Sequence, residues 1–449
     1  MNARRQGSAE FMGSFRRARL LGAAALLVLT PATPLAAQDA LVVRGGTVHP
    51  VAGESFVADV VIEDGVIVAV GPDATASAGA QVIDASGLHV YPGMFDAVTE
   101  LGLTEIGSID VTEDINELGD YTPHLRAMTA IHPASEHIPV ARANGITHAL
   151  VVPGGGADAG GFPGQGAIIH LDGWTVEEML IKPSAVLAMN WPSLDTREFN
   201  RETFEVETRP YEEAKEEYDR GVHALTQWFD AARHYIEAGG EGAPGAPDLR
   251  LAAIARALNG EIPVLVRAES ERQIRDVIAF AQERGLDLIL AGAGEASRVA
   301  DLIASENIPV ILGPTQSMPS APDAPYDESY ANPGKLHAAG VEIAFATFNS
   351  SDVRTLPYEA AMAIPYGLPR DAAFEAITLA PAEIFGLDAR FGSIEPGKVA
   401  NLIVTDGDPL EITTQIRHLI IDGREVSTMN RHLELYQTYR ARPTPPNGN

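Results

Sequence analysis

Histidines and carboxylates are the residues of this chain that could do chemistry, because no cysteine is present. The sequence has 12 His, 61 Asp plus Glu and 0 Cys in 449 residues. Thiolate metal sites, disulfides and cysteine nucleophiles are therefore excluded. A metal centre or an acid–base site would have to use imidazole and carboxylate groups. No pair of histidines has the spacing of metal ligands at a strand end, so we expect each to pack or to face solvent. The histidines are His49, His89, His124, His132, His137, His148, His170, His223, His234, His337, His418 and His432.

Two glycine-rich segments, 153–156 and 160–166, have the composition of a phosphate-binding loop. Such a loop ends in Lys followed by Ser or Thr, and both segments lack that ending. We therefore expect tight turns here.

The charge balance also argues against binding of phosphate groups, because 61 acidic residues stand against 32 basic ones and the formal net charge is -29. A surface this acidic repels phosphate backbones, which excludes nucleic acid as a partner.

The elements that would position a site alternate along the middle of the chain. Short apolar runs are separated by amphipathic helical segments, a pattern typical of parallel strands covered by helices. The pattern predicts an α/β fold with a (β/α)8 TIM-type barrel over residues 91–388, whose functional groups lie at the C-terminal ends of the strands. The charged segment 200–247 is predicted to be a helical insertion. The runs expected as strands are 149–152, 167–171, 263–266, 288–291, 309–312 and 343–346.

Both ends of the mature chain are rich in short strand-like segments. The pairs Asp64-Gly65 and Asp422-Gly423 indicate tight hairpins between some of them. We expect the two ends, residues 38–90 and 389–440, to meet in one small β-sandwich. A proline-rich disordered tail, 441–449, should follow it.

The first 37 residues have the layout of a secretory signal peptide. Arg16, Arg17 and Arg19 precede the apolar run 20–30, and small residues end at Ala37. The apolar run is too short for a permanent membrane span. We expect cleavage after Ala37, a periplasmic or secreted protein, and no membrane span after cleavage.

Several motifs closely resemble the amidohydrolase superfamily, in particular its secreted imidazolonepropionase-like branch. Two of them read Val90-Tyr-Pro-Gly-Met-Phe-Asp96 and Gly392-Ser-Ile-Glu-Pro-Gly-Lys398. The resemblance implies hydrolysis of C–N bonds with zinc or another divalent metal at the barrel mouth. It also implies a His-x-His after the first barrel strand, two later histidines and an aspartate after the last strand. The remaining motifs are 41–48, 62–67, 356–361, 376–386, 406–409 and 421–424.

The positions at which this family places metal ligands hold other residues here. The resemblance puts the His-x-His on Val98 and Glu100, the later histidines on Arg267 and Gly292, and the aspartate on Phe348. Of these side chains only Glu100 can ligate a cation. We therefore expect the metal-ligand motifs to be lost and no metal or other cofactor to be held.

A polar set of side chains replaces the expected metal site: Glu100, Arg267, Glu269 and Asn349. Arg267 could pair with Glu100 where the cation would lie, as a structural substitute for it. Alternatively, Glu100 or Glu269 could be a general base, with Arg267 clamping the carboxylate of a substrate.

Three functions remain open from the sequence. The first is a non-catalytic structural or regulatory partner of an active amidohydrolase, in a homo-oligomer or a hetero-oligomer with an active paralogue. The second is a hydrolase of amides, cyclic imides or small peptides with an atypical site, and the third is a small-ligand binding protein. The long excursion 103–135 after the first barrel strand either covers the mouth or forms an interface.

Overall fold

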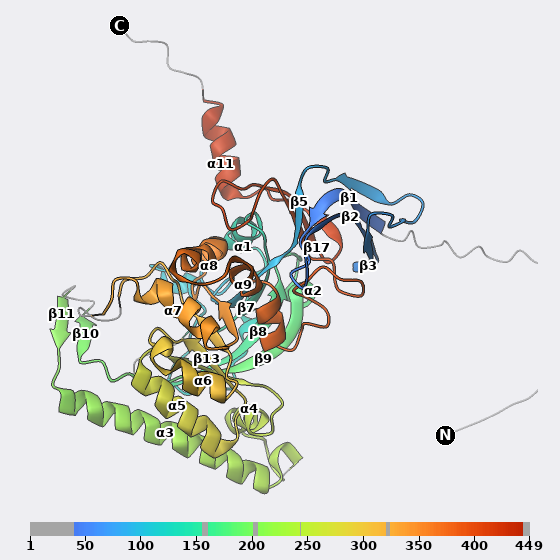
Figure 1. Cartoon of the computed structure of the whole chain (residues 1–449). Helices are drawn as coiled ribbons and strands as arrows, with labels where there is room; N and C mark the ends of the chain where they lie inside the picture. Colours follow the sequence, from blue (N-terminus) through green and yellow to red (C-terminus); the bar gives the residue numbers. More distant parts are fainter. Residues whose placement is uncertain (1–39, 155–159, 201–204, 243, 320–323, 443–449) are drawn as a thin grey trace, which may run out of the picture. The chain divides into compact units, whose positions relative to one another are not determined.

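The structure is a computed structural model of the chain, and it describes residues 40–154, 160–200, 205–242, 244–319 and 324–442 (Figure 1). The expected signal peptide, 1–37, and most of the expected tail lie outside these ranges. Within them, no helix is long and apolar enough to cross a membrane.

Strands from the two chain ends join in one sheet, as the sequence predicted. The strand order is β18-β17-β16-β5-β1-β2-β3, and β4 also pairs with β1. Because β5 pairs with β1 on one side and with β16 on the other, the chain ends share one apolar core. The strands are β1 (Ala40–Val48), β2 (Phe56–Glu63), β3 (Val66–Gly71), β4 (Gln81–Asp84), β5 (His89–Pro92), β16 (Leu402–Thr405), β17 (Ile416–Ile421) and β18 (Arg424–Val426).

The middle of the chain forms a second eight-stranded sheet that curls into the predicted barrel. Its order is β6-β7-β8-β9-β12-β13-β14-β15. The first and last strands meet through the N–H of Phe348, which donates to the carbonyl of Val98 at 2.9 Å. The strands are β6 (Met94–Thr99), β7 (Ile146–Val151), β8 (Gly161–His170), β9 (Leu180–Asn190), β12 (Val264–Ala268), β13 (Leu288–Gly292), β14 (Val310–Leu312) and β15 (Ile343–Phe345).

One barrel strand runs against the prediction of uniformly parallel strands. β8 is antiparallel to both β7 and β9. The chain between β7 and β8 is too short for the crossover helix that a parallel pair requires, so the two strands form a hairpin. The N-terminal end of β8 therefore lies at the mouth, and His170 at its C-terminal end lies at the opposite end of the barrel.

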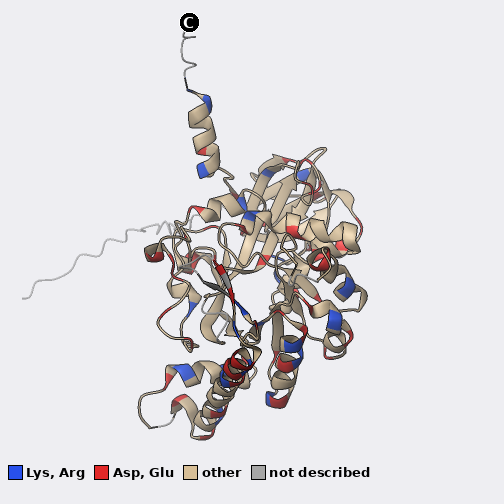
Figure 2. Cartoon of the chain, turned by 90° about the vertical axis from the view of Figure 1, so that its left-hand side faces the viewer, with Lys and Arg blue, Asp and Glu red and all other residues tan. Residues whose placement is uncertain are grey.

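Most of the helices cover the outside of the barrel sheet (Figure 1). The helices are α1 (His137–Arg142), α2 (Val176–Met179), α3 (Tyr211–Glu237), α4 (Leu249–Leu258), α5 (Glu271–Arg284), α6 (Ala300–Ser305), α7 (Glu328–Ala338), α8 (Leu356–Ala363), α9 (Arg370–Glu375), α10 (Leu379–Ile384) and α11 (Arg431–Arg440). Helix α11 does not cover that sheet and buries no residue. Acidic and basic side chains are interspersed on these helices and on the loops (Figure 2).

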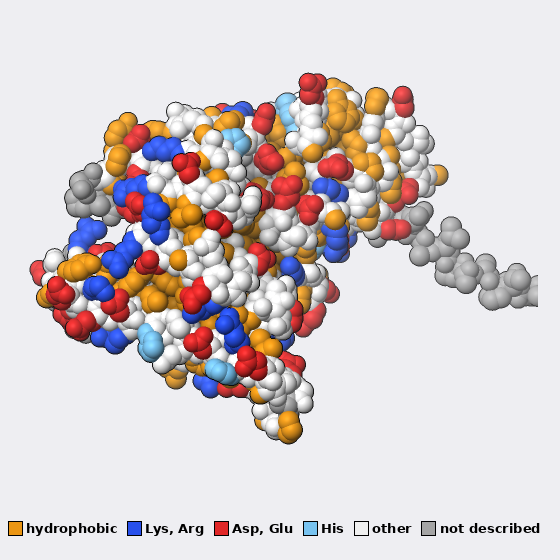
Figure 3. All heavy atoms as spheres, turned by 60° about the horizontal axis from the view of Figure 1, so that its bottom comes forward, with side chains coloured by type: hydrophobic (Ala, Val, Ile, Leu, Met, Phe, Trp, Pro, Cys, Tyr) orange, Lys and Arg blue, Asp and Glu red, His pale blue; other side chains and the backbone are white. Residues whose placement is uncertain are grey.

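The predicted helical insertion 200–247 is only partly helical. A hairpin of β10 (Arg197–Asn200) and β11 (Glu205–Thr208) precedes α3. The helix buries Leu225 and Phe229 on one face and leaves its charges on the other, and Figure 3 shows acidic and basic side chains mixed on the face of the molecule that carries it. A second difference concerns 389–440, which was expected to be all sandwich but ends in α11.

Candidate functional site

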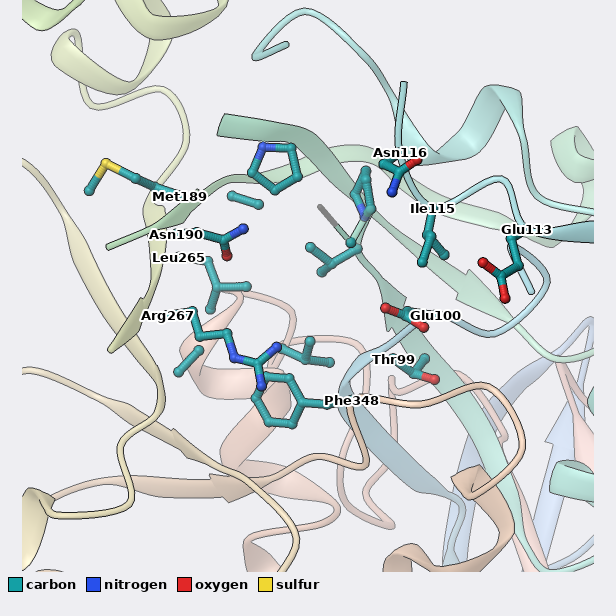
Figure 4. A pocket seen from close by; sticks show the side chains of 17 residues that line it. Thr99, Glu100, Glu113, Ile115, Asn116, Met189, Asn190, Leu265, Arg267 and Phe348 are labelled. Carbon is teal, nitrogen blue, oxygen red and sulfur yellow. The ribbon is translucent and has the colours of Figure 1, made fainter. Parts of the chain in front are cut away.

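A cavity of about 440 Å³ lies at the barrel mouth (Figure 4). Strand ends β6, β9 and β12 provide Glu100, Asn190 and Arg267, and Phe348 follows β15. In a barrel of this kind the loops after the strands form the site, so the cavity lies where the sequence placed the chemistry. The other lining residues are Val98, Thr99, Glu113, Ile115, Asn116, Val152, Pro153, Gly154, Pro163, Ala188, Met189, Leu265 and Ala291.

The excursion 103–135 covers part of this mouth. Its residues Glu113, Ile115 and Asn116 line the cavity. Farther along, the N–H of Phe162 in β8 donates to Asp120 O at 2.8 Å, and backbone bonds continue along this edge. The excursion thus pairs with the end of the reversed strand, which anchors it over the cavity.

Arg267 is held at the end of β12 by two neighbours. Its Nε lies 3.4 Å from Oε1 of Glu269, and its guanidinium carbon lies 5.4 Å from the centroid of the Phe348 ring. The expected pairing with Glu100 is not formed, because the ion pair that the described residues make with Arg267 is the one to Glu269. Phe348 itself has φ 54°, a left-handed conformation that is costly for a bulky residue. Strain of this kind is often found at binding sites.

Glu100 faces the same cavity from β6 and has no donor to its carboxylate among the described residues. Burial raises its pKa, Arg267 opposes that rise, and Glu113 adds to it. Gly154 lies close beside it, since a Cβ at that position would be 3.0 Å from Oε1 of Glu100. The mouth therefore presents a half-buried carboxylate and a fixed guanidinium to the same space.

Glu269 lies on the other side of Arg267, in a smaller cavity of about 210 Å³. Its Oε2 accepts from the N–H of Gly294 at 3.3 Å. Its carboxylate also covers Gly292, where an added Cβ would lie 2.3 Å from Oε1. Glu269 thus fills the space that a histidine side chain at position 292 would need.

Asn349 does not belong to the cavity. Its side-chain oxygen accepts from the N–H groups of Ser351 and Asp352 at 2.7 and 3.3 Å. These bonds close an exposed turn after β15, which is a structural task typical of asparagine. The structure therefore separates Asn349 from the other three predicted site residues.

Sequence reasoning missed the most deeply buried acid near the mouth. Asp96 of β6 is fully buried, and its Oδ1 accepts from the N–H groups of Val98 and Thr347 at 3.3 and 3.1 Å. Thr347 also donates its hydroxyl to the other oxygen. Burial raises the pKa of Asp96 to about 7, although these bonds lower it. The motif ending in Asp96 was a signal that could have identified it.

Asn190, Glu113 and Asn116 were also missed as lining residues. Asn190 ends β9, so its place at a strand end gave a usable signal. Glu113 and Asn116 lie in the excursion, and no periodic pattern in the sequence shows how that segment folds.

The barrel histidines lie far from this chemistry in the fold. His148 of β7 and His170 of β8 are register partners at the end of the barrel away from the mouth. The side-chain amide of Asn401 contacts both rings, at 2.5 and 3.4 Å. Burial lowers the pKa of both imidazoles, that of His170 to about 4. They are packed groups, in agreement with the expectation that the histidines pack or face solvent, and their low pKa keeps them neutral at neutral pH.

The residues at the mouth do not fit the divalent metal that the resemblance implies. Val98, Gly292 and Phe348 carry no donor atom, and Arg267 places a positive charge where a ligand would stand. Among the described residues, no three His, Asp or Glu side chains are grouped to hold a metal ion.

Comparison with known proteins places these observations in a family. Residues 175–429, more than half of the chain, match the model of the amidohydrolase family. "Amidohydrolase tasK" of Hapsidospora irregularis is 26% identical over 400 residues, which are 82% of this chain and 40% of that protein. The chain therefore spans about 40% of the length of this curated relative.

Solved structures agree with the fold. An amidohydrolase from Thermotoga maritima MSB8 is 28% identical with a TM-score of 0.75, over 87% of this chain and 100% of that one. Molinate hydrolase, at 17% identity, has a TM-score of 0.55 over 92% of this chain and 99% of its own, a likeness that shows the fold alone.

Proposed function

The chain belongs to the amidohydrolase family, and from this premise we propose that it is a non-hydrolytic member whose barrel mouth binds a small molecule with a carboxylate group. The observation that carries the proposal is Arg267. It stands at a position where the family has a metal ligand, it is oriented by Glu269 and Phe348, and it faces a cavity of about 440 Å³. A guanidinium is the side chain best suited to bind a carboxylate through two hydrogen bonds.

The side of the cavity opposite Arg267 is acidic, which indicates that the ligand carries a positive charge as well. Glu100 and Glu113 lie there, and Figure 4 shows Glu100 and Arg267 pointing into the same space. The amides of Asn116 and Asn190 add polar contacts. A ligand with an ammonium at one end and a carboxylate at the other satisfies both sides, so free amino acids and dipeptides are the class we propose. The volume is in the usual range of small-molecule sites.

A binding experiment with a panel of amino acids and dipeptides tests the proposal. A bound ligand raises the melting temperature by mass action, with about 2.7 kcal/mol of stabilisation at a hundred times Kd. We expect such stabilisation without release of a product. A panel in which nothing stabilises the protein would contradict the proposal.

A hydrolase with an atypical site is the second candidate, and the raised pKa of Glu100 favours it. A buried carboxylate of this kind can be a general base. Turnover of an N-acyl amino acid or dipeptide that survives a chelator and is lost in Glu100→Gln would establish this candidate and refute the first.

The cellular role we propose is that of a regulatory or structural partner of an active relative, exercised in the periplasm or outside the cell. The framework motifs are present while the ligand positions are replaced, which supports a role that needs the fold and not the reaction. The signal-like N-terminus supports export. Light scattering after co-expression with an active relative tests the partnership, and a purely monomeric protein that forms no complex would refute it.

A further inference from the structure

A larger cavity, about 720 Å³, lies between the sheet formed by the chain ends and helix α9, and it shares no lining residue with the barrel mouth. Tyr91 of β5 and the loop between β1 and β2, which carries His49 and Ser55, form one side of its wall. The barrel side contributes Arg370 and Phe374 of α9. Neither the mouth nor the family chemistry uses this site.

A line of hydrogen-bonded side chains opens onto this cavity. The hydroxyl of Ser55 lies 2.7 Å from Nδ1 of His49, and Nε2 of His49 lies 2.9 Å from Nδ1 of His89. His49 directly follows β1, and its backbone N–H donates to the carbonyl of Val90 in β5 at 2.9 Å. Its ring stacks on Tyr91 with 4.0 Å between the centroids and 8° between the planes. The imidazole is therefore fixed in position and orientation, while Ser55 is exposed.

We propose that Ser55 is a nucleophile for acyl transfer, with His49 as its general base and His89 as the positioning residue of that base. A serine within hydrogen-bond reach of a histidine that a third group orients is the arrangement that activates a hydroxyl. In the tautomer that serves this role, Ser55 donates to His49 Nδ1, and His49 donates its Nε2 proton to His89.

The charges around the cavity define the substrate class. Glu54, Asp371, Glu375 and Asp408 line it, and Arg370 is committed to Asp408 by an ion pair. This acidic lining disfavours an anion. The apolar faces of Tyr91 and Phe374 suit a short acyl or alkyl group. The proposed substrates are therefore small carboxylic esters that are uncharged or cationic.

The reaction balances with water as the only co-reactant. The Oγ of Ser55 bonds to the ester carbonyl carbon as its proton moves to His49, and the bond to the leaving alcohol breaks as His49 returns that proton to it. Water then attacks the acyl carbon while His49 takes its proton. The bond between that carbon and Oγ of Ser55 breaks, His49 returns the proton to Oγ, and the carboxylic acid leaves.

Two further features of this cavity bear on the assignment. Burial and the neighbouring His89 lower the pKa of His49 to about 4, against the opposing effect of Asp408. The other charged groups that line this cavity are Glu54, Arg370, Asp371 and Glu375. His49 is therefore neutral at neutral pH and its Nδ1 is free to accept a proton, but the low pKa makes it a weak base, so its contribution rests on its fixed position beside Ser55. The loop that carries Ser55 also contains Val51 at φ 73°, a strained conformation for a β-branched residue.

Reaction with p-nitrophenyl acetate tests the proposal on the full chain. We expect a burst of nitrophenol at neutral pH and one acetyl group on the peptide that contains Ser55, detected by mass spectrometry after an acid quench. Ser55→Ala, an exposed change in a loop, should lose the burst and lower turnover by at least about tenfold. Ser86→Ala is the matched control, because Ser86 is an exposed serine of the same sheet that hydrogen-bonds to a carboxylate, Asp84, and not to an imidazole.

His89→Gln separates a positioning role from a structural one. If His89 positions the base, the variant lowers the acylation rate constant measured from the burst, at an unchanged dissociation constant for the ester and an unchanged melting temperature. Absence of an acetyl group on Ser55 in the unaltered protein overturns the proposal. Equal turnover by Ser55→Ala and the unaltered protein overturns it as well, since other nucleophiles would then carry the reaction.

Discussion

At the scale of single residues, the side chain at position 267, at the end of β12, decides which charge the barrel mouth attracts. A neutral imidazole there could ligate a cation, whereas the guanidinium of Arg267 repels cations and attracts anions at any physiological pH. Glu269 pairs with Arg267 and covers Gly292. The ring of Phe348, at the position where the resemblance implies an aspartate ligand, faces the guanidinium.

Arg267→Ala should weaken ligand binding and hardly change stability. The side chains of Arg267 and Glu269 are 49% and 52% exposed, so their ion pair is worth less than about 1 kcal/mol. We expect the free energy of unfolding in urea to change by no more than that amount, and the Kd of a mouth ligand to rise at least about tenfold.

Arg275→Ala is the matched control for that experiment. Arg275 is similarly exposed and pairs with Glu271 on α5, away from the cavity. Arg275→Ala should leave the free energy of unfolding and the Kd of the mouth ligand unchanged. A large loss of stability in Arg267→Ala with ligand binding retained would instead show that Arg267 is a structural replacement for the metal.

Asp96→Asn should change how stability depends on pH. The pKa of Asp96 is raised by burial to about 7, above the value of about 4 in an unfolded chain. Its contribution to stability is therefore complete below about pH 4 and is lost as the pH rises through about 7, a loss on the order of 4 kcal/mol. The amide can keep the bonds from the N–H groups of Val98 and Thr347, so the variant should lack this decline.

Urea unfolding of both proteins across this pH range measures the effect. The unaltered protein should lose stability relative to Asp96→Asn as the pH rises. Parallel curves for the two proteins would mean that the carboxyl group ionises in the folded state with an ordinary pKa.

At the scale of elements, the reversed strand β8 shapes the mouth. Its N-terminal end lies against the excursion, and two glycines make that approach possible. Gly161 has φ +152°, and a Cβ on it would lie 2.1 Å from Asp120 O. Gly164 has φ +146°, and a Cβ on it would lie 2.9 Å from Leu125 O. The glycine-rich composition that resembled a phosphate loop thus serves close contact between two backbones.

Gly161→Ala should destabilise the protein by more than about 2 kcal/mol, because the new methyl group meets a backbone carbonyl that cannot move freely. It should also loosen the excursion and weaken mouth ligands. Gly71→Ala at the end of β3 is the control, since nothing lies within 4 Å of its added Cβ. Urea unfolding of the two variants checks this, and equal stabilities would show that the excursion does not press on β8.

The sequence predicted the elements in which the spacing of apolar residues reflects burial. It failed where the length of a connection, or pairing between distant segments, determines the structure. The barrel strands that begin with β12 lie close to the expected runs, because strands buried on both faces are continuously apolar. The direction of β8 follows from the short connection between β7 and β8, which has no crossover helix, and not from the residues of β8 itself. Of the site, Glu100 and Arg267 were predicted by motif position, whereas Glu113 comes from a loop whose path no periodicity encodes.

At the scale of the whole molecule, the sheet formed by the two chain ends is joined directly to the first strand of the barrel. β5 leads directly into β6, and β16 pairs with β5. The N–H of Gly93, between β5 and β6, donates to Asn401 O at 2.8 Å. The framework motifs at both ends therefore maintain the barrel's first strand, which explains how they can be present while the ligand positions differ.

Metal dependence is a property of the whole fold and gives the broadest test. A metal ion at the mouth would tie together the ends of β6, β12, β13 and β15, so its removal would lower the melting temperature. Here Arg267, Glu269 and Phe348 make direct contacts among the ends of β12, β13 and β15, and the backbone N–H of Phe348 donates to Val98 O in β6. We therefore expect a chelator to leave the melting temperature and ligand binding unchanged, and elemental mass spectrometry to find less than about a tenth of an equivalent of zinc, manganese or iron, even after zinc loading. Stoichiometric metal that survives dialysis would contradict the proposed non-hydrolytic mouth and favour a metal-dependent hydrolase. The guanidinium of Arg267 would then have to lie away from the bound dication.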